Sequence, residues 1–261
     1  MSDWNAQDYE QHSSAQQKWA KELIVKLNLK GNERILDLGC GDGKITAELA
    51  RCVPSGSVMG IDQSEAMITL AQTRYPSAQV ENLQFQQMDA RQLTFQNQFD
   101  VVFSNATLHW VDDHVAVLNG LAAGLRSQGR ILLQMGGHGN ASEIIKAFDI
   151  VTQQPQWRQY FIDFTFPYFF NRPADYRTWL PKAGFTPQRV ELIPKDMTHN
   201  GSTELAGWIR TTWFPYINQV PEAMRDRLVA VVLEQYLQTH PPLNDGFTHV
   251  KMIRLEVEAR K

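Results

Sequence analysis

A loop rich in glycine and acidic residues is the first segment whose residue types and spacing could do chemistry. Residues 37–43 read DLGCGDG and directly follow a short apolar run. Glycine lets a backbone turn sharply and approach a ligand where a Cβ would collide. Free amide groups at the start of a following helix can then meet the negative part of the ligand. The loop therefore predicts a ligand site, although a tight turn without a ligand has the same pattern.

The spacing of these glycines separates two classes of nucleotide-binding loop. A dinucleotide fingerprint has the form GxGxxG, and Lys44 stands where its third glycine would fall. The loop instead reads GxGxG, preceded by Asp37. A nicotinamide-dependent enzyme is therefore disfavoured.

Three acidic residues lie at the carboxyl ends of three successive predicted strands. Asp37 opens the glycine loop, Asp62 ends the run SVMGID, and Asp89 follows LQFQQM. The carboxyl ends of parallel strands meet at the edge of an open sheet where ligands bind, so these carboxylates should line one crevice. A carboxylate at the position of Asp62 can accept hydrogen bonds from both ribose hydroxyls of a nucleoside. A negatively lined crevice favours a ligand with a cation, and S-adenosylmethionine carries a sulfonium and an ammonium.

The elements that must position these residues alternate between strands and helices. A helix is predicted at 13–29, others follow the glycine loop and Ser64, and another contains residues 115–125. Such alternation predicts an α/β fold with a doubly wound, mostly parallel sheet. Its strands are predicted at 34–39, 57–62, 83–88, 99–106 and 130–135.

The alternation is lost in the C-terminal half of the chain. Residues 138–180 are rich in aromatic side chains, and they precede a predicted strand at 188–193. Two helices are predicted near 202–218 and 221–239, before a last strand at 249–259. We therefore expect a single domain, 1–261, in which a mainly helical, aromatic-rich lid is inserted into the C-terminal half. The sheet core would comprise about 20–136, 185–194 and 248–261, and the lid about 137–184 and 195–247.

Composition narrows the possible partners. The chain has 261 residues, of which 43% are apolar, and a net charge of −3. It can bury a full core, and it lacks the basic character of a nucleic-acid-binding protein. Cys40 and Cys52 form no metal-binding or disulfide pattern. With no apolar signal and no apolar run of about 20 residues, we expect a cytoplasmic protein without a membrane span or a metal, as a monomer or weak homodimer.

Four runs resemble those of class I S-adenosylmethionine-dependent methyltransferases. ILDLGCGDG, GIDQS, MDA and FDVVFSNATLHWV occur in this order within about residues 1–135. The SNATLHW run is similar to that of the trans-aconitate methyltransferase group. The resemblance implies a Rossmann-like methyltransferase fold and the transfer of a methyl group from S-adenosylmethionine, which leaves S-adenosylhomocysteine.

The resemblance also implies roles around the cofactor. Asp62 would hold the ribose, while Asp89 and the amide of Ala90 would contact the adenine. Gly39 and Gly41 would lie along the methionine part. The predicted cofactor set is Tyr9, Asp37, Gly39, Cys40, Gly41, Asp62, Gln63, Asp89, Ala90 and Asn105.

Two members of this set have more particular roles. Asn105, at the end of the fourth strand, would present its backbone to the methionine ammonium. Tyr9 is similar to a tyrosine that folds over the cofactor in these enzymes, although it could equally be an ordinary packing residue.

The predicted acceptor side of the site is aromatic. His109 and Trp110 directly follow the fourth strand and should face the transferring methyl group. His109 is the candidate catalytic residue, but it could act as a base, hydrogen-bond an acceptor oxygen or be purely structural. In the lid, Arg210 offers a bidentate clamp for a carboxylate, and Trp213 and Tyr216 are further substrate-binding candidates. Aromatic residues at helical spacing are also typical of a core.

The leading hypothesis is methyl transfer to a small organic acceptor, with an oxygen of a hydrophobic carboxylic acid as the preferred target. One alternative is a C-methyltransferase or a lipid-modifying transferase on the same scaffold. Another is a non-catalytic protein that binds S-adenosylmethionine. The aromatic lid argues against a pure sensor, because such an enclosure suits an acceptor and excludes water.

Overall fold

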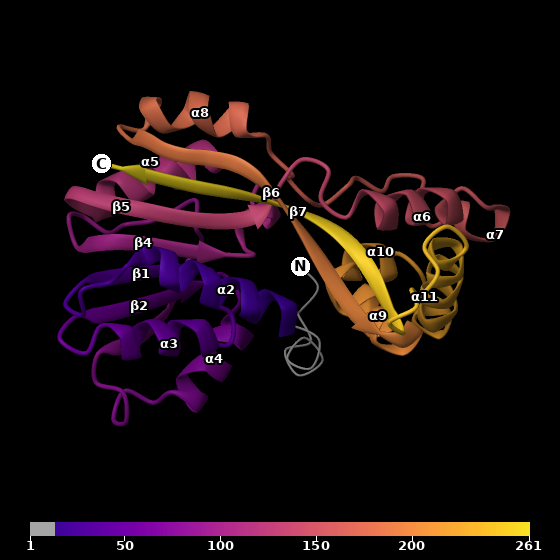
Figure 1. Ribbon diagram of the computed structural model, residues 1–261, viewed down its shortest axis with the longest axis horizontal. Coiled ribbons are helices and arrows are strands. Elements are labelled where there is room, and N and C mark those ends of the chain that lie inside the picture. Colours follow the sequence, from indigo (N-terminus) through magenta and orange to yellow (C-terminus); the bar gives the residue numbers. More distant parts are fainter. Residues whose placement is uncertain (1–13) are drawn as a thin grey trace.

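The computed structural model describes residues 14–261, with side chains from residue 19 onward. Seven strands form one sheet in the order β3-β2-β1-β4-β5-β7-β6 (Figure 1). Strands β1 to β5 run parallel, and β7 is antiparallel to both of its neighbours. This confirms the predicted α/β fold with a mostly parallel sheet. The strands are β1 (Arg34–Leu38), β2 (Ser57–Asp62), β3 (Leu83–Gln87), β4 (Phe99–Asn105), β5 (Leu125–Gly136), β6 (Thr186–Asn200) and β7 (Phe247–Arg260).

Helices cover both faces of this sheet. Ile35 packs with α2 and α3 on one face, while its neighbour Leu36 packs with α5 and α8 on the other. Both faces of the central strands are therefore buried, which explains why these strands read as nearly continuous apolar runs. The helices beside the sheet are α2 (Ser14–Leu27), α3 (Lys44–Cys52), α4 (Glu65–Arg74), α5 (His114–Gly124) and α8 (Pro173–Lys182), with a short 3₁₀ turn, η1 (Leu108–Trp110).

The remaining helices form a second core at the far ends of β6 and β7. Figure 1 shows these two strands running out of the sheet and into this helical part. β5 pairs with β7 only up to Arg254, whereas β6 accompanies β7 over its whole length. We call this part the lid, and its helices are α6 (Ser142–Thr152), α7 (Pro155–Arg158), α9 (Gly201–Thr212), α10 (Phe214–Ile217) and α11 (Glu222–Leu237).

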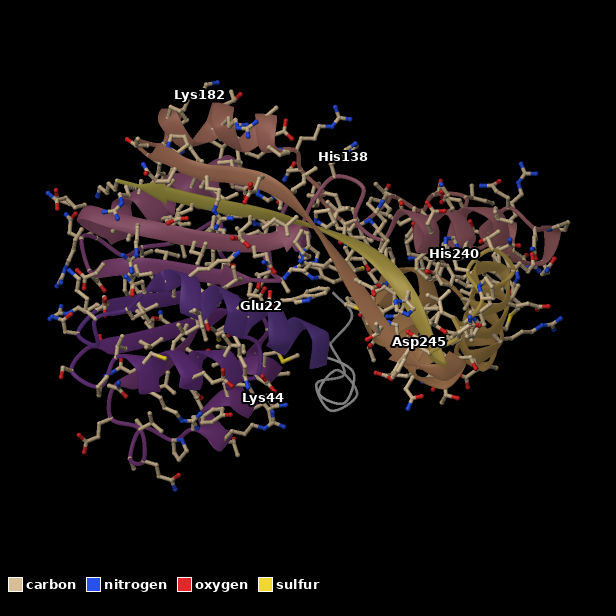
Figure 2. All side chains as sticks on the ribbon, viewed as in Figure 1. Glu22, Lys44, His138, Lys182, His240 and Asp245 are labelled. Atoms are coloured by element: carbon tan, nitrogen blue, oxygen red, sulfur yellow. The ribbon has the colours of Figure 1, made fainter. Side chains whose placement is uncertain are left out.

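Three local features differ from the expected boundaries. Residues 173–182, which the sequence grouped with the lid, form α8, and its Tyr176 and Leu180 are buried against the sheet. In Figure 2, Lys182 at the end of α8 lies over the sheet, whereas His240 and Asp245 lie in the lid. The helix expected at 202–218 is divided into α9 and α10, with Pro215 at the start of α10, because proline cannot donate the backbone hydrogen bond that a continuous helix needs. β6 extends seven residues past its predicted end at 193.

None of the helices within residues 14–261 is long and apolar enough to cross a membrane.

Candidate cofactor and acceptor site

The glycine loop is held against the ends of β2 and β4. Gly39 has φ +77° and Gly41 has φ +53°, left-handed conformations that favour glycine. The Gly39 amide donates to the Ile61 carbonyl over 2.7 Å. A Cβ at Gly39 would lie 2.1 Å from the Thr107 side chain, whereas no described atom lies within 4 Å of a Cβ at Gly41. The backbone is therefore tightly packed at Gly39 and open at Gly41.

Asp62 links the end of β2 to this loop. One carboxylate oxygen accepts from the Gly41 amide over 3.0 Å and the other from the Ser64 amide over 2.9 Å. Each oxygen of a carboxylate has a second acceptor position, so both can still bind a ribose hydroxyl. Burial raises the pKa of Asp62, although the bonds from the Ser64 and Gly41 amides oppose that rise. Ser64 also caps α4, because its hydroxyl accepts from the Met67 amide.

Asp37 is the most deeply buried acid of the site. It is 2% exposed, and the Thr46 hydroxyl donates to it over 2.7 Å. Burial raises the pKa of Asp37 to about 7, the Thr46 bond opposes this rise, and the charge of Asp62 adds to it. A cation close to these two carboxylates would remove much of that electrostatic cost. The acidic pair therefore fits the positive part of S-adenosylmethionine, and the open backbone at Gly41 leaves room beside it.

The third acid lies at the adjoining strand end. The Met88 amide donates to the Asp62 carbonyl over 3.0 Å, which joins the end of β3 to the end of β2. Asp89 forms an ion pair with Arg91 at 2.7 Å, and Arg91 holds the pKa of Asp89 below its usual value. Arg91 also binds Asp112 at 2.9 Å. An adenine amino group at Asp89 would therefore share that carboxylate with Arg91. The strand pattern in the sequence does not predict this ion pair.

Three further predicted cofactor residues lie within the described part of the chain. The Cys40 amide donates to the Ile61 carbonyl over 2.9 Å. The Gln63 carbonyl accepts from the Gln87 side chain over 3.1 Å. Ala90, beside Asp89, is partly buried against the sheet core. Tyr9 lies outside the residues that the structure describes.

Thr107, two residues after Asn105, joins the end of β4 to the glycine loop. The Thr107 hydroxyl lies 3.1 Å from the Gly39 carbonyl and 3.2 Å from the Asn105 carbonyl, so it can donate to either. One hydroxyl thus bridges the two backbone segments predicted to contact the methionine part. Thr107, just after β4, and Thr46, in the first turn of α3, were not predicted as site residues, because a single threonine has no distinguishing pattern in the sequence.

His109 lies on η1, beyond β4, and is 9% exposed. Its Nδ1 accepts a hydrogen bond from the Gly136 amide over 3.3 Å. Burial, then the positive charge of Arg254, lowers the pKa of His109 well below its usual value. A neutral imidazole whose Nδ1 is an acceptor carries its proton on Nε2, so His109 is assigned as a hydrogen-bond donor at that atom.

Aromatic rings from the lid surround His109. Tyr168 stacks on it with ring centroids 6.2 Å apart, and Phe170 lies at 6.0 Å. Trp110 contacts Tyr168 at 4.6 Å and Phe214 of α10 at 5.4 Å. We call Trp110, Tyr168, Phe170 and Phe214 the aromatic cluster. Tyr168 and Phe170 were not singled out as site residues, because only the folded chain returns the segment after α7 to the end of β4.

The predicted substrate-binding residues of the lid lie in different environments. Trp213 and Tyr216 are buried in the lid core, although Trp213 also meets Tyr168 at 5.1 Å. Arg210 is 45% exposed in its side chain and pairs with Asp226 of α11 at 3.5 Å. No described contact joins Arg210 to the aromatic cluster, so its role as a carboxylate clamp stays a prediction. Within residues 14–261, no group of three or more His, Cys, Asp or Glu side chains could hold a metal ion.

A glycine loop, three acids at strand ends and the aromatic cluster lie at the carboxyl edge of this sheet. The model of a methyltransferase domain matches residues 29–161, which include the glycine loop, all three acids and His109. The chain belongs to the S-adenosylmethionine-dependent methyltransferase family.

Individual relatives extend this match to the whole chain. The chain is 34% identical to an uncharacterised methyltransferase of Schizosaccharomyces pombe, over 99% of this chain and 98% of the relative. It is 25% identical to trans-aconitate 2-methyltransferase of Rhodopseudomonas palustris, over 98% of both chains.

Solved structures share the fold at lower identity. The YcgJ protein of Bacillus subtilis matches with a TM-score of 0.63 and 16% identity, over 93% of this chain and 97% of that one. A Haemonchus contortus phosphoethanolamine N-methyltransferase, solved with S-adenosylhomocysteine, matches with a TM-score of 0.61 and 22% identity, over 98% of this chain and 57% of that one.

Proposed function

We propose that this methyltransferase esterifies a small carboxylic acid, with one carboxylate oxygen of the acceptor as the methylated atom. The observation that carries the proposal is the placement of His109, which is buried and accepts the Gly136 amide at Nδ1, and from which we infer a neutral ring with its proton on Nε2. Such a histidine is a poor general base, because its free nitrogen already accepts the Gly136 amide and its pKa is far below neutral. A carboxylic acid has a pKa near ~4, is ionised at neutral pH and needs no base.

The cofactor supplies an activated methyl group, so the residues of the chain chiefly have to bind, align and exclude water. We infer that Asp37 and Asp62 hold the cationic and ribose parts, and that Asp89 and Ala90 border the adenine. His109 Nε2 would donate to the acceptor oxygen that is not methylated. The aromatic cluster would cover the hydrocarbon part of the acceptor. The similarity to trans-aconitate 2-methyltransferases supports a carboxylate acceptor.

The linkage between the methyl group and its acceptor tests this function. The purified protein is incubated with methyl-labelled S-adenosylmethionine and, in parallel, with trans-aconitate, crotonate and a phenol. We expect label in the carboxylic acids, in a form that mild alkali releases as methanol, because esters hydrolyse and aryl ethers or C-methyl groups do not. Label that survives alkali would overturn the proposal in favour of C-methylation or phenol methylation.

The role of His109 makes a separate prediction. His109→Ala should lower kcat for a carboxylate acceptor less than about tenfold, because only one neutral hydrogen bond, worth about 0.5–1.5 kcal/mol, is lost. His109→Gln, which can keep a donor near the position of Nε2, should recover part of that loss. Steady-state kinetics on one confirmed acceptor measure both variants. A fall of about 10²–10⁴-fold in His109→Ala would instead identify a general base.

Cofactor binding is expected to weaken as the pH falls below about 7. The raised pKa of Asp37, about 7, means that its carboxyl group is protonated in the free protein below that pH. A cationic ligand favours the carboxylate and must displace this proton, so the apparent Kd should rise about tenfold per pH unit. In the absence of ligand, between about pH 4 and pH 7, the folded protein holds a proton on Asp37 that the unfolded chain has released. The contribution of Asp37 to the free energy of unfolding therefore falls as the pH rises through this range.

Calorimetry with S-adenosylmethionine, in the absence of an acceptor, between pH 5.5 and 7.0 measures this dependence, and two buffers of different ionisation enthalpy report the proton release. Asp37→Asn is the matched control, since its amide has the same shape and does not titrate. An equally steep pH dependence in Asp37→Asn would show that another group is responsible.

A further inference from the structure

A pocket of about 410 Å³ opens at the amino edge of the sheet, the edge opposite to the glycine loop. Figure 1 shows this edge where β7 reaches the C-terminus, on the side of the sheet away from the lid. Ligand pockets commonly measure about 300–1,000 Å³, so there is room for a small molecule. We call it the amino-edge pocket, and its charged lining residues are Lys30, Glu33, Asp100, Arg126, Arg130 and Arg260.

An irregularity in β5 brings two arginines to the amino-edge pocket. Leu125 pairs with Phe99 of β4 and Arg130 with Val101, so residues 126–129 of β5 stand where β4 has a single residue. Gln128, in this bulge, has φ +64°, a left-handed conformation that is uncommon for a residue other than glycine. Strained backbone of this kind is frequent at binding sites. The bulge places both Arg126 and Arg130 in the lining of the pocket.

Arg130 and Arg260 lie directly opposite each other on β5 and β7. Opposite residues of an antiparallel pair project from the same face of the sheet, and like charges in these positions destabilise it. Arg130 donates to the Leu27 carbonyl, which carries no net charge. An anion between the two guanidinium groups would remove this repulsion.

The two acids of the pocket already have hydrogen-bond partners. The Glu33 carboxylate accepts from the three preceding backbone amides, residues 30–32, over 2.7, 3.0 and 3.2 Å. The Asp100 carboxylate accepts from the Arg34 amide over 2.8 Å and from Arg126 over 3.1 Å. These contacts direct both carboxylates to other partners than Lys30 and Arg260. Among the described residues, neither of these two cations forms an ion pair or a side-chain hydrogen bond.

The charge of the lining indicates the kind of ligand. Four cations stand against two acids, which leaves an excess of two positive charges. A phosphate monoester carries about 1.5 to 2 negative charges at pH 7 and has three strong acceptor oxygens. Guanidinium groups match these oxygens in geometry. A single carboxylate would balance only half of the excess charge.

We propose that the amino-edge pocket binds a phosphate monoester, with the phosphate group between Arg130 and Arg260 and within reach of Lys30. The rest of the pocket has room for a short organic body. The site is separate from the one that transfers the methyl group, because it lies at the other edge of the sheet. The inference therefore does not depend on the identity of the methyl acceptor.

Calorimetry on protein saturated with S-adenosylhomocysteine tests the pocket while the cofactor site is occupied. The probes are glycerol 3-phosphate, acetate and glycerol. We expect glycerol 3-phosphate to bind at one site per chain, at least about tenfold more tightly than acetate, and glycerol not to bind. Sedimentation with phosphatidylcholine vesicles that contain phosphatidic acid presents the same phosphate group on a lipid. Stronger binding to these vesicles than to glycerol 3-phosphate would identify a lipid headgroup as the source.

Two variants remove charge without breaking a described side-chain contact. Lys30→Gln and Arg260→Gln should each weaken glycerol 3-phosphate binding at least about fivefold. Gln128→Glu places a carboxylate of the same shape in the lining and should weaken it at least about tenfold. The matched control is Arg227→Gln, which removes the same charge from an exposed position on α11 and should change binding less than about twofold.

The affinity for S-adenosylhomocysteine reports the folding of each variant and should stay within about twofold of the wild type. Absence of binding to both glycerol 3-phosphate and the phosphatidic acid vesicles would overturn the proposal. Equal weakening by Arg227→Gln and Arg260→Gln would also overturn it, because the attraction would then follow the net charge of the protein. Neither result would affect the proposed methylation of a carboxylate, which the ester assay tests separately.

Discussion

Replacing Asp62 with alanine should weaken S-adenosylhomocysteine binding by about 10–150-fold, the loss of about 1.5–3 kcal/mol expected when hydrogen bonds to a charged group are removed. Two effects act in the same direction. The ribose hydroxyls lose their charged acceptor, and the Gly41 and Ser64 amides lose the carboxylate that now holds them at 3.0 and 2.9 Å. Calorimetry on the folded variant measures the change.

Asp42→Ala is the matched control for charge in the same loop. Asp42 pairs with Arg74 at 2.6 Å, on the side of the loop that faces α4. Its removal costs the loop one negative charge without touching the end of β2, so the Kd should change less than about threefold. If Asp62→Ala binds as tightly as the wild type, the ribose is held by other residues.

Replacing Gly39 with alanine should destabilise the protein by about 2–5 kcal/mol and impair cofactor binding. A left-handed residue other than glycine costs about 1–2 kcal/mol, and forcing an extra carbon into a packed site adds about 1–3 kcal/mol. Both terms apply at Gly39, because its φ is +77° and a Cβ would lie 2.1 Å from Thr107. Urea unfolding with and without S-adenosylhomocysteine measures the two effects.

Gly41→Ala provides the comparison. The φ of Gly41 is also positive, but a Cβ added there would meet no described atom within 4 Å. Only the backbone cost of about 1–2 kcal/mol applies there. Equal destabilisation of the two variants would show that Thr107 moves aside and that the packing at Gly39 is not tight.

The parallel part of the sheet and the strand-end positions of Asp37 and Asp62 could be predicted from the sequence. The strands β1, β2 and β4 are largely buried, so each reads as a short, mostly apolar run whose end is visible in the sequence. Asp37 and Asp62 follow such runs, and parallel topology brings strand ends together at one edge. Their meeting, with Asp62 bound to the Gly41 amide, follows from local pattern and chain direction alone.

The lid was predicted only in outline, because its helices and strands are stabilised by contacts between residues that are far apart in the sequence. Residues 195–200 carry no apolar run, yet they form the outer half of β6 since β7 supplies their hydrogen bonds. The sequence predicts Trp213 and Tyr216 as substrate-binding residues. In the structure, the packing of α9, α10 and α11 buries both side chains in the lid core.

The contacts behind the proposed acceptor side arise from tertiary structure. The sequence left His109 open as a base, a donor or a structural residue, and the Gly136 amide, 27 positions away, lies at its Nδ1 only in the folded chain. Arg254 is 145 residues from His109 and lies near it only because β7 enters the sheet antiparallel beside β5. A proton's position and the effect of a charge depend on distances of a few ångströms and on the exclusion of water, and neither is encoded in spacing along the chain.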